Sequence, residues 1–223
     1  MRTIAPEAAH PRPGGHRRSV RLSRRRTTIE GVVRRELSRW PRGRPIHTLG
    51  RLRDLTFAVI CELLLGVTDP PTVEHLHRLI RRSTGPVALA GTWLWPIRSG
   101  SLQDWASRRV QRHQVAVGGA LVGVVDGEIT GSSSSDVLTA LVQAAHASGP
   151  LAGALYDELR ALLVVGHETT AAALAWSLER LARSPAIATR LAASIDDQDS
   201  SSLRSFIFEV LRWRPPVVAP CAS

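Results

Sequence analysis

Lysine and asparagine are absent from this sequence of 223 residues. Its 29 basic residues, histidine aside, are therefore all arginine. The codons of both missing amino acids begin with AA, and a GC-rich genome depletes such codons. The abundance of arginine and the net charge of +10 therefore say less about an anionic partner than they would in a chain of ordinary composition.

Cysteine is scarce as well, since Cys61 and Cys221 are the only two in the chain and have no C-x-x-C spacing. Two such cysteines exclude a disulfide framework and are typical of a reducing compartment. No run of about 18 apolar residues is present, and the N-terminus contains no apolar signal-peptide region. We therefore predict a cytoplasmic protein with no membrane partner.

Positive charge is concentrated in residues 1–53, which contain 15 arginines and three acidic residues, whereas the remainder contains 14 arginines and 16 acidic residues. Arginine-rich arms can neutralise phosphates, so nucleic-acid binding is one hypothesis for this segment. However, the segment lacks interleaved aromatic residues and finger or zipper spacing, and prolines interrupt it. Nucleic-acid binding therefore remains a disfavoured alternative.

Apolar residues recur at helical spacing along most of the chain. Predicted helices cover residues 51–66, the stretch after the turn at 69–71, residues 102–125, residues 155–181 and a last segment that ends at Pro215 and Pro216. The pattern at 155–181 is the longest, and its weak charge predicts burial on most faces. We predict a mainly α fold with a long central helix. An Arg-rich, partly helical segment at 1–50 would precede a helical domain at 51–223.

The segment before the last helix reads as a polar loop, at residues 194–202, and the segment at 127–136 also reads as a loop. Ser201 or Ser202 could cap the last helix. Its apolar residues are predicted to face inward: Leu203, Phe206, Ile207, Val210 and Leu211.

Histidines give no metal-site pattern. The zinc motif HExxH begins at His167 and Glu168, but Ala171 occupies the position of the second histidine. His75 and His77 lie two residues apart, so a helix would point them in different directions. We predict that both are surface residues.

Polar residues interrupt the long apolar helix at its centre, where Gly166 is followed by Glu168, Thr169 and Thr170. Threonines inside a helix can bond back to carbonyls, and a glycine allows a local bulge or kink, so a polar notch is predicted. An acid and an alcohol in such a notch can relay protons. Alternatively, these groups satisfy one another in a crowded core.

A second motif, EVLRWRPP, places Glu209 and Arg212 three residues apart before a double proline. Alone, this spacing describes an ordinary helical ion pair. A helix with G-x-E-T-T followed by a helix with E-x-x-R resembles two helices of the cytochrome P450 family, the long oxygen-binding helix and the ExxR helix. This resemblance implies an incomplete cytochrome P450-like helical fold.

The resemblance extends upstream and covers most of residues 14–218. The stretch at 51–69 is similar to a family helix with a D-L-T-x-x-V-I pattern. Gly15, His16 and Arg21 resemble the Arg-rich helix whose His and Arg hold the haem propionates, although the family spacing is four residues and here it is five. The resemblance therefore implies a cofactor-binding role for His16 and Arg21.

The resemblance also implies roles for the two central motifs. Glu168 and Thr169 would be the catalytic acid and alcohol that deliver protons, and Gly166 would make room beside the cofactor. Glu209 and Arg212 would be structural and would stabilise the haem-side core. Haem is the cofactor expected for the family.

The sequence departs from the family at two points. Val165 stands where the family has Ala or Gly, which would narrow the pocket. The family's ligand cysteine lies in an FxxGxRxCxG-like loop, whereas Cys221 follows Val-Ala-Pro. No haem-ligand cysteine and no other metal ligand is therefore predicted, and the chain reads as an inactive fragment.

Three hypotheses follow. The first is a haem monooxygenase that acts on a small organic substrate with an electron-donor redox protein, inactive as this chain. The second is a non-catalytic helical remnant or partner protein. The third is the Arg-rich nucleic-acid-binding protein.

Overall fold

The structure is a computed structural model that describes residues 15–83, 108, 111–112, 114–125, 138–139, 143, 152–197 and 199–217. For residues 15–24 and 152–154 it describes the backbone alone. Within these ranges all regular secondary structure is helical and no strand occurs. The prediction of a mainly α fold is confirmed. The predicted loop at 127–136 lies outside the described residues, and the predicted helix at 102–125 is described continuously over Gln114–Val125.

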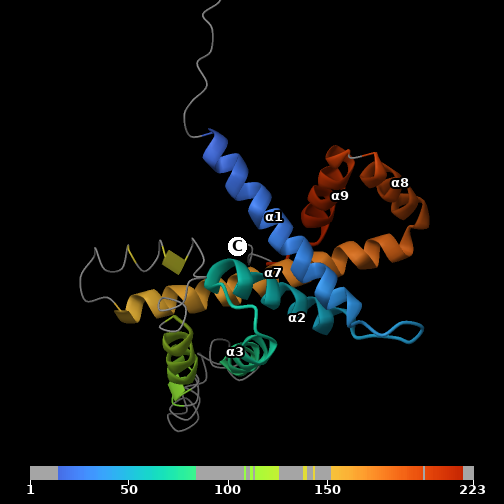
Figure 1. Ribbon diagram of the computed structural model, residues 1–223. Coiled ribbons are helices and arrows are strands. Elements are labelled where there is room, and N and C mark those ends of the chain that lie inside the picture. The colour runs from blue at the N-terminus through green and yellow to red at the C-terminus, as the bar shows by residue number, and fades with distance from the viewer. Residues whose placement is uncertain are drawn as a thin grey trace, which may run out of the picture.

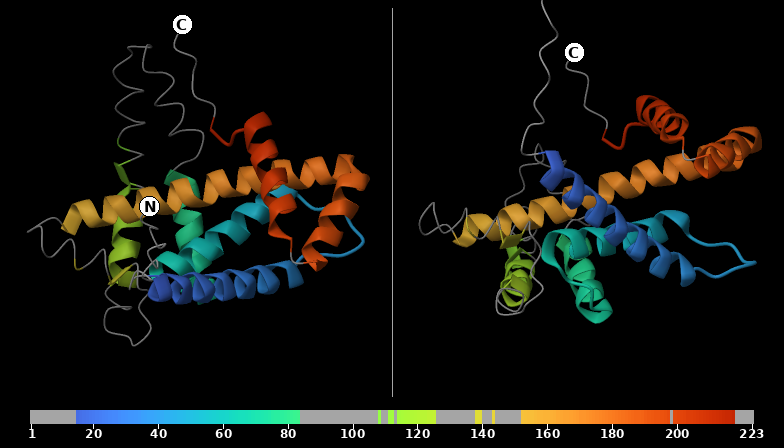
Figure 2. Two further views of the ribbon diagram at one scale, coloured as in Figure 1. Left: turned by 90° about the horizontal axis from the view of Figure 1, so that it is seen from above. Right: turned by 45° about the horizontal axis from the view of Figure 1, so that its top comes forward.

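The helices are arranged around one long helix, α7 (Figure 1). In chain order they are α1 (Gly15–Ser38), α2 (Thr48–Ile60), the π-helix η1 (Cys61–Leu65), α3 (Pro70–Ser83), α7 (Ala152–Arg183), α8 (Pro185–Asp196) and α9 (Ser200–Trp213). Helix α2 lies along the middle of α7, α1 crosses α2, and α8 and α9 lie at the C-terminal end of α7 (Figures 1 and 2). The predicted long central helix is confirmed.

The helix predicted to end at Gly66 does so, but its last turn is widened. Residues 61–65 form a π-helix, and the Gly66 N–H donates to the Cys61 carbonyl. Gly66 has a φ of 79°, a left-handed conformation that glycine adopts without steric cost. A sequence pattern of 3.6 residues per turn does not reveal such a local widening.

Two apolar clusters form the core. The larger one joins α2, η1, α3, α7 and the helix at 114–125, and it includes Phe57, Leu65, Ile80, Leu121 and Leu163, all fully buried. The smaller one joins Leu52, Leu55 and Ala171, with Val33 and Trp40 packed against it. Burial of each such Leu or Phe side chain contributes about 1.5–3 kcal/mol. The second cluster fastens the C-terminal half of α1 to α2 and α7.

Gly166 lies where α7 packs closely against the end of α2. A Cβ atom at this position would collide with the Cδ1 methyl of Ile60. The predicted bulge or kink at Gly166 is wrong, because α7 remains an uninterrupted α-helix from 152 to 183. The glycine is explained instead by close helix packing, which only the neighbouring helix could reveal.

The region after α7 corrects two further predictions. Pro185 ends α7 and also begins α8 at its first turn, since proline lacks only an N–H that a first turn leaves unpaired anyway. Helix α8 is not among the predicted helices, and the predicted loop at 194–202 is too long, because α8 extends to Asp196 and α9 begins at Ser200. The cap of α9 is Asp199, which accepts hydrogen bonds from Ser201 and Ser202. These bonds lower the pKa of Asp199 to about 2.

Apolar side chains on α7 and α9 are more exposed than the sequence pattern indicates. Of the residues predicted to face inward on α9, Val210 is buried, whereas Ile207 is 41% exposed. On α7, Leu162 and Val165 are 42% and 62% exposed. The predicted burial of α7 on most faces is wrong in this part of the chain.

Helix α7 is also long and apolar enough, from Leu155 to Arg183, to cross a membrane. A core helix of a soluble protein can have the same length and composition. The charged Glu168 and the buried His167 lie at the centre of α7, where a bilayer would disfavour them strongly. These residues argue against α7 as a membrane span.

Candidate functional site

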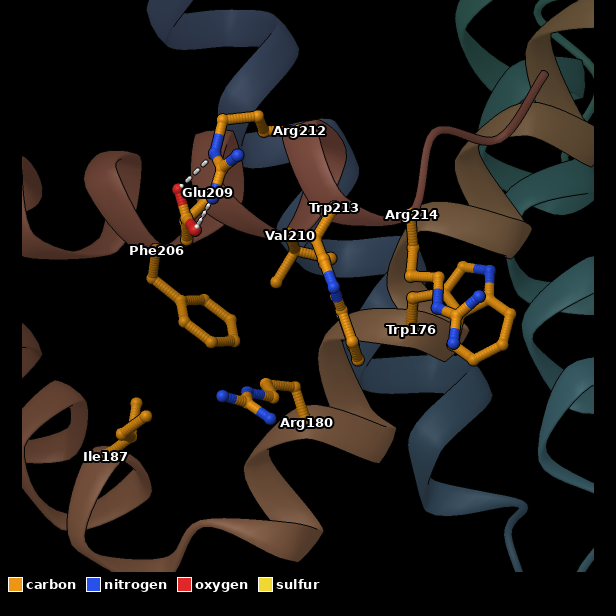
Figure 3. A pocket seen from close by; sticks show the side chains of 9 residues that line it. All are labelled: Trp176, Arg180, Ile187, Phe206, Glu209, Val210, Arg212, Trp213 and Arg214. Carbon is orange, nitrogen blue, oxygen red and sulfur yellow. Dashed lines mark hydrogen bonds and ion pairs between the residues drawn. The ribbon is translucent and has the colours of Figure 1, made fainter. Parts of the chain in front are cut away.

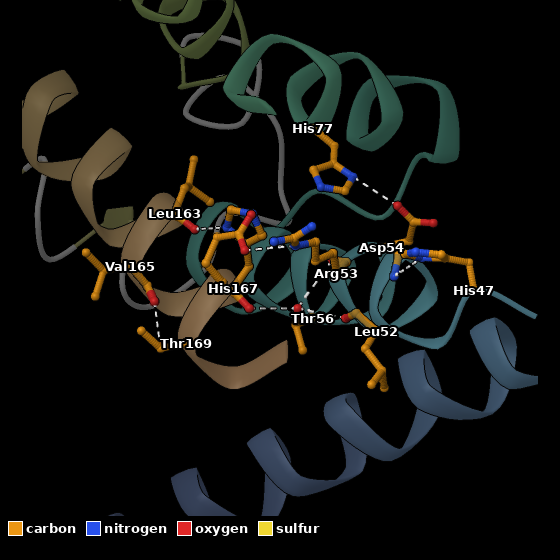
Figure 4. Close-up of polar contacts among 12 residues, drawn as sticks. His47, Leu52, Arg53, Asp54, Thr56, His77, Leu163, Val165, His167 and Thr169 are labelled. Carbon is orange, nitrogen blue, oxygen red and sulfur yellow. Dashed lines mark hydrogen bonds and ion pairs between the residues drawn. The ribbon is translucent and has the colours of Figure 1, made fainter. Parts of the chain in front are cut away.

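The central polar residues of α7 face α2, and an ion pair connects the two helices. Arg53 Nε donates to Glu168 Oε2 at 2.9 Å, and each side chain is about one third exposed (Figure 4). An ion pair at this depth orients the carboxylate while leaving part of it open to water. Arg53 was not singled out in the sequence, although it directly precedes the D-L-T motif at 54–56.

A second contact joins α2 to the same turn of α7. The Thr56 hydroxyl lies 2.9 Å from the Leu52 carbonyl and 3.0 Å from the His167 carbonyl. Because a hydroxyl has one proton, it donates to one of these oxygens at a time. The carbonyl of His167 thus has a partner outside its own helix, which fixes this turn of α7 against α2.

His167 is fully buried, directly before Glu168. Its Nδ1 lies 2.6 Å from the Leu163 carbonyl, and because a carbonyl only accepts, Nδ1 carries the proton. Its Nε2 lies 3.5 Å from Glu168 Oε1. Burial lowers the pKa of His167, and the contacts with Leu163 and Glu168 oppose this effect only in part. His167 is therefore neutral at neutral pH.

His77 also lies in this region, and the prediction that it is a surface residue is wrong. Its ring stacks on Phe57 at 4.5 Å between centroids, and its Nδ1 lies 3.3 Å from Asp54 Oδ1. The spacing of His77 from Val73 and Ile80 places all three on one apolar stripe of α3. That stripe was the available signal. His75 is exposed, as predicted.

Thr169 and Thr170 bond back to their own helix. Their hydroxyls donate to the carbonyls of Val165 and Gly166, each at 2.7 Å. In the described part of the chain no hydrogen bond joins Thr169 to Glu168. Both threonines thus bond back within α7, as expected, and the Thr169 oxygen can still accept a hydrogen bond.

Glu209 and Arg212 form a bidentate pair on α9, with Arg212 Nε and Nη2 donating to the carboxylate at 2.9 and 2.6 Å. The hydrogen bond from Arg212 lowers the pKa of Glu209. The two side chains are 63% and 71% exposed respectively. In the described structure this pair lies at the surface, and its predicted structural role stays a prediction.

A cavity of about 380 Å³ lies beside this pair, between α7, α8 and α9 (Figure 3). Arg214 lies over the rings of Trp176 and Trp213, at 4.9 and 4.6 Å from their centroids. Arg180 lies over Trp213 from the other helix, at 5.5 Å. These cation–π contacts hold the end of α9 against α7.

The remaining predicted residues are less informative. The structure describes the backbone of His16 and Arg21, on α1, but not their side chains, so their role stays a prediction. Burial raises the pKa of the Cys61 thiol to about 12, and such a thiol does not serve as a thiolate ligand. Cys221 lies outside the described residues. Within those residues, no three side chains of His, Cys, Asp or Glu form a metal-binding group.

The fold and the site together define a helical protein in which a central helix presents an acid and an alcohol and a later helix carries an ExxR pair. A scan against models of known protein families gives no match. Individual proteins do match this chain, and they bear the name cytochrome P450.

Cytochrome P450 135A1 of Mycobacterium tuberculosis is 31% identical over 206 residues, which are 88% of this chain and 44% of the relative. Cytochrome P450 137 of the same organism is 32% identical over 193 residues, or 84% of this chain and 40% of the relative. Cytochrome P450 138 of Mycobacterium bovis is 29% identical over 196 residues, which are 84% of this chain and 43% of the relative. These similarities confirm the resemblance to the cytochrome P450 family, and the chain spans less than half the length of these relatives.

Proposed function

We propose that this chain forms the central helical part of a P450-type haem monooxygenase, in which Glu168 and Thr169 manage protons. The observation that carries the proposal is the setting of Glu168. Its carboxylate lies at the middle of α7, with Oε2 held by Arg53 and Oε1 within 3.5 Å of His167 Nε2. A general acid needs such a fixed, partly open carboxylate near its proton source.

The described residues fit one wall of a haem pocket but not the iron ligand. Leu162, Val165 and Thr169 follow one another on one face of α7, and the first two are well exposed. This face offers an apolar surface to a flat group. Cys61 faces the core with a raised pKa, so no described cysteine supplies the thiolate. We derive no step that passes through the iron.

Haem, when bound, supplies the oxygen chemistry of the family. The chain's own residues would place and move protons. Glu168 would hold a proton at Oε1, while Arg53 keeps the other oxygen in position. The Thr169 hydroxyl donates to Val165, so its oxygen would accept a hydrogen bond from water on the exposed face. The side chain of Val165 would leave less space in the pocket beside this face than Ala or Gly would.

We further propose that the 223-residue chain alone does not bind haem through a cysteine thiolate. The chain with added haemin, reduced under carbon monoxide, is expected to lack the red-shifted Soret band. If the native chain shows this band and the Cys221→Ala variant loses it, this part of the proposal is wrong.

A chimera tests the function itself. Residues after 217 would be replaced by the segment of cytochrome P450 135A1 that follows the aligned region. We expect the chimera to show the red-shifted band, and Glu168→Gln to keep the band while lowering turnover by about 10²-fold or more. Glu158→Gln, on an exposed position of the same helix, is the matched control. A chimera without the band, or equal turnover of Glu168→Gln and the control, would contradict the proposal.

The same proposal covers partners and location. A complete enzyme would take a small organic substrate and electrons from a redox protein, in the cytoplasm. The alternative of a non-catalytic helical remnant is favoured by one observation, the surface position of Glu209 and Arg212. The chimera separates the two, since a remnant would not acquire the haem band.

A further inference from the structure

The cavity between α7, α8 and α9 has a wall of aromatic and aliphatic side chains (Figure 3). They come from all three helices and are Trp176, Ile187, Phe206, Val210 and Trp213. Trp213 is 55% exposed and Trp176 is 37% exposed, so solvent reaches the cavity from their side. With a volume of about 380 Å³, the cavity is large enough for a small organic molecule.

Positive charge exceeds negative charge in this cavity, whose charged residues are Arg180, Arg212, Arg214 and Glu209. Both carboxylate oxygens of Glu209 already accept hydrogen bonds from Arg212. The hydrogen bond from Arg212 is the main cause of the lowered pKa of Glu209, and the charge of Arg180 contributes least. Arg180 and Arg214 therefore have no acid of their own in the described part of the chain.

These two arginines have different surroundings. Arg214 lies over two rings, those of Trp176 and Trp213, at 4.9 and 4.6 Å from the centroids. Arg180 lies over the Trp213 ring at the longer distance of 5.5 Å. Figure 3 shows the two guanidinium groups on opposite sides of the Trp213 ring, with Arg180 on the side of Ile187 and Phe206. Arg180 is therefore the cation that faces the apolar wall of the cavity.

The N–H donors of Arg180 are available to a ligand. Within the residues that the structure describes, its side chain makes no hydrogen bond and no ion pair. The contact with Trp213 attracts the charge of the guanidinium but uses none of its five N–H donors. A guanidinium with free donors binds a carboxylate through two parallel hydrogen bonds. Apolar walls strengthen such a contact because they keep water away from it.

We propose that this cavity is a binding site for a small organic anion with an apolar, aromatic body. Its carboxylate accepts hydrogen bonds from Arg180, and its body packs against Ile187, Phe206 and Val210. The ligand also covers the exposed face of Trp213. A ligand of this class satisfies both halves of the lining, which a neutral hydrocarbon or an inorganic anion alone does not.

The site is separate from the acid and alcohol at the centre of α7. Trp176 and Arg180 lie eight and twelve residues after Glu168 in the same helix, about 12 and 18 Å farther along its axis. A molecule in the cavity therefore does not replace the monooxygenase substrate. The inference goes beyond the proposed function and does not depend on haem.

The first test uses the native 223-residue chain and isothermal titration calorimetry. Naphthalene-2-carboxylate is expected to bind at one site. Naphthalene-2-carboxamide has the same shape without the charge and should bind about tenfold more weakly or less. Sodium sulfate has charge without an apolar body and should give no measurable binding at the same concentrations. Absence of carboxylate binding, or equal binding of the carboxamide or of sulfate, would overturn the proposal.

Nuclear magnetic resonance locates the bound probe. The indole N–H signals of Trp176 and Trp213, assigned with Trp176→Phe and Trp213→Phe, should shift on addition of naphthalene-2-carboxylate. The signal of Trp40, which packs against the other end of the fold at Leu52 and Leu55, should stay in place. Shifts that leave Trp213 unaffected would place the probe elsewhere and overturn the site.

A set of arginine variants tests the role of Arg180. Arg180→Met keeps an apolar stem and should weaken binding of naphthalene-2-carboxylate about tenfold or more, whereas Arg180→Lys keeps the charge and should lose less. Arg204→Met, at an exposed position of α9 outside the cavity, removes the same charge and should bind like the native chain. Native affinity in Arg180→Met, or an equal loss in Arg204→Met, would contradict the assignment. The comparison of probes in the native chain decides the proposal even where a variant does not fold.

Discussion

Two ion pairs belong to the two motifs of this chain, and their surroundings differ. Arg53–Glu168 joins two helices at a depth where each side chain is about one third exposed, and two buried histidines lie beside it. Glu209–Arg212 lies within one helix, largely in solvent. Exposed pairs contribute little because water screens them and the side chains lose freedom. Good hydrogen-bond geometry therefore does not by itself indicate how much an ion pair contributes to the fold or the site. The burial and the neighbours of the pair are the better indication.

The largest effect is expected from removing the aromatic ring that supports the deeper site. Phe57→Ala should lower the free energy of unfolding by about 3–5 kcal/mol, because it leaves a cavity between the two histidines and the core. Phe208→Ala, at a position 64% exposed on α9, is the control and should change stability little. Urea denaturation followed by circular dichroism measures both. Equal losses would remove the distinction between the two regions.

The helix crossing offers the next test. Gly166→Ala should destabilise the chain by up to about 2 kcal/mol, because overpacking against Ile60 costs about 1–3 kcal/mol and alanine's helix preference offsets about 1 kcal/mol. The second change Ile60→Ala should relieve part of that strain. Gly119→Ala, where a new Cβ meets no atom within 4 Å, should instead be neutral or stabilising, since alanine favours helices. A stabilised Gly166→Ala variant would show that α2 and α7 do not pack as closely as described.

Acid should weaken the deeper region. The pKa of His167 in the folded chain lies below the ordinary value of 6.5, so below that pH the unfolded chain binds more protons. The contribution of neutral His167 to stability is complete above pH 6.5 and is lost as pH falls through the lowered pKa. The free energy of unfolding should fall by at most about 1.4 kcal/mol per pH unit in this range.

Unfolding midpoints between pH 4.5 and 7.5 test this. The fall in stability should flatten in His167→Phe and persist in the exposed His75→Phe. An unchanged pH dependence in His167→Phe would contradict a buried, neutral His167.

The smallest effects concern the ion pairs themselves. Arg53→Met should cost about 0.5–1 kcal/mol and should free the Glu168 carboxylate, whose titration can be followed by ¹³C NMR. Arg212→Met should leave the melting temperature unchanged within error, while the pKa of Glu209 rises toward its ordinary value because the hydrogen bond that lowers it is lost. A larger loss at Arg212 than at Arg53 would reverse the comparison.

Sequence patterns predicted several helices well because local signals bound them. Gly66 ends the second helix, the turn at 69–71 begins α3, and prolines flank α7. Helix α8 is not among the predicted helices, because a proline after an apolar run indicates the end of a helix rather than the start of the next one. The cap of α9 was assigned to serines, although Asp199 accepts from both of them. Such errors arise where one residue serves two neighbouring elements.

The candidate site was predictable only in part. Glu168 and Thr169 stood out because polar residues in an apolar helix need a reason. Arg53 and His77 did not, since each lies about a hundred residues from its contact on α7 and is ordinary in its own helix. The partner of a side chain is a property of the packed helices, so burial of His77 and the ion pair of Glu168 required the tertiary structure.

By itself the sequence determined the helical class, the long central helix and the resemblance to cytochromes P450, because helix periodicity, proline and glycine signals and short motifs are local. Only the tertiary structure decided why residue 166 is glycine and which arginine holds Glu168. It alone also showed that two histidines on different helices share one buried space. Those features depend on how closely α2, α3 and α7 approach, and that distance is set by packing across the chain.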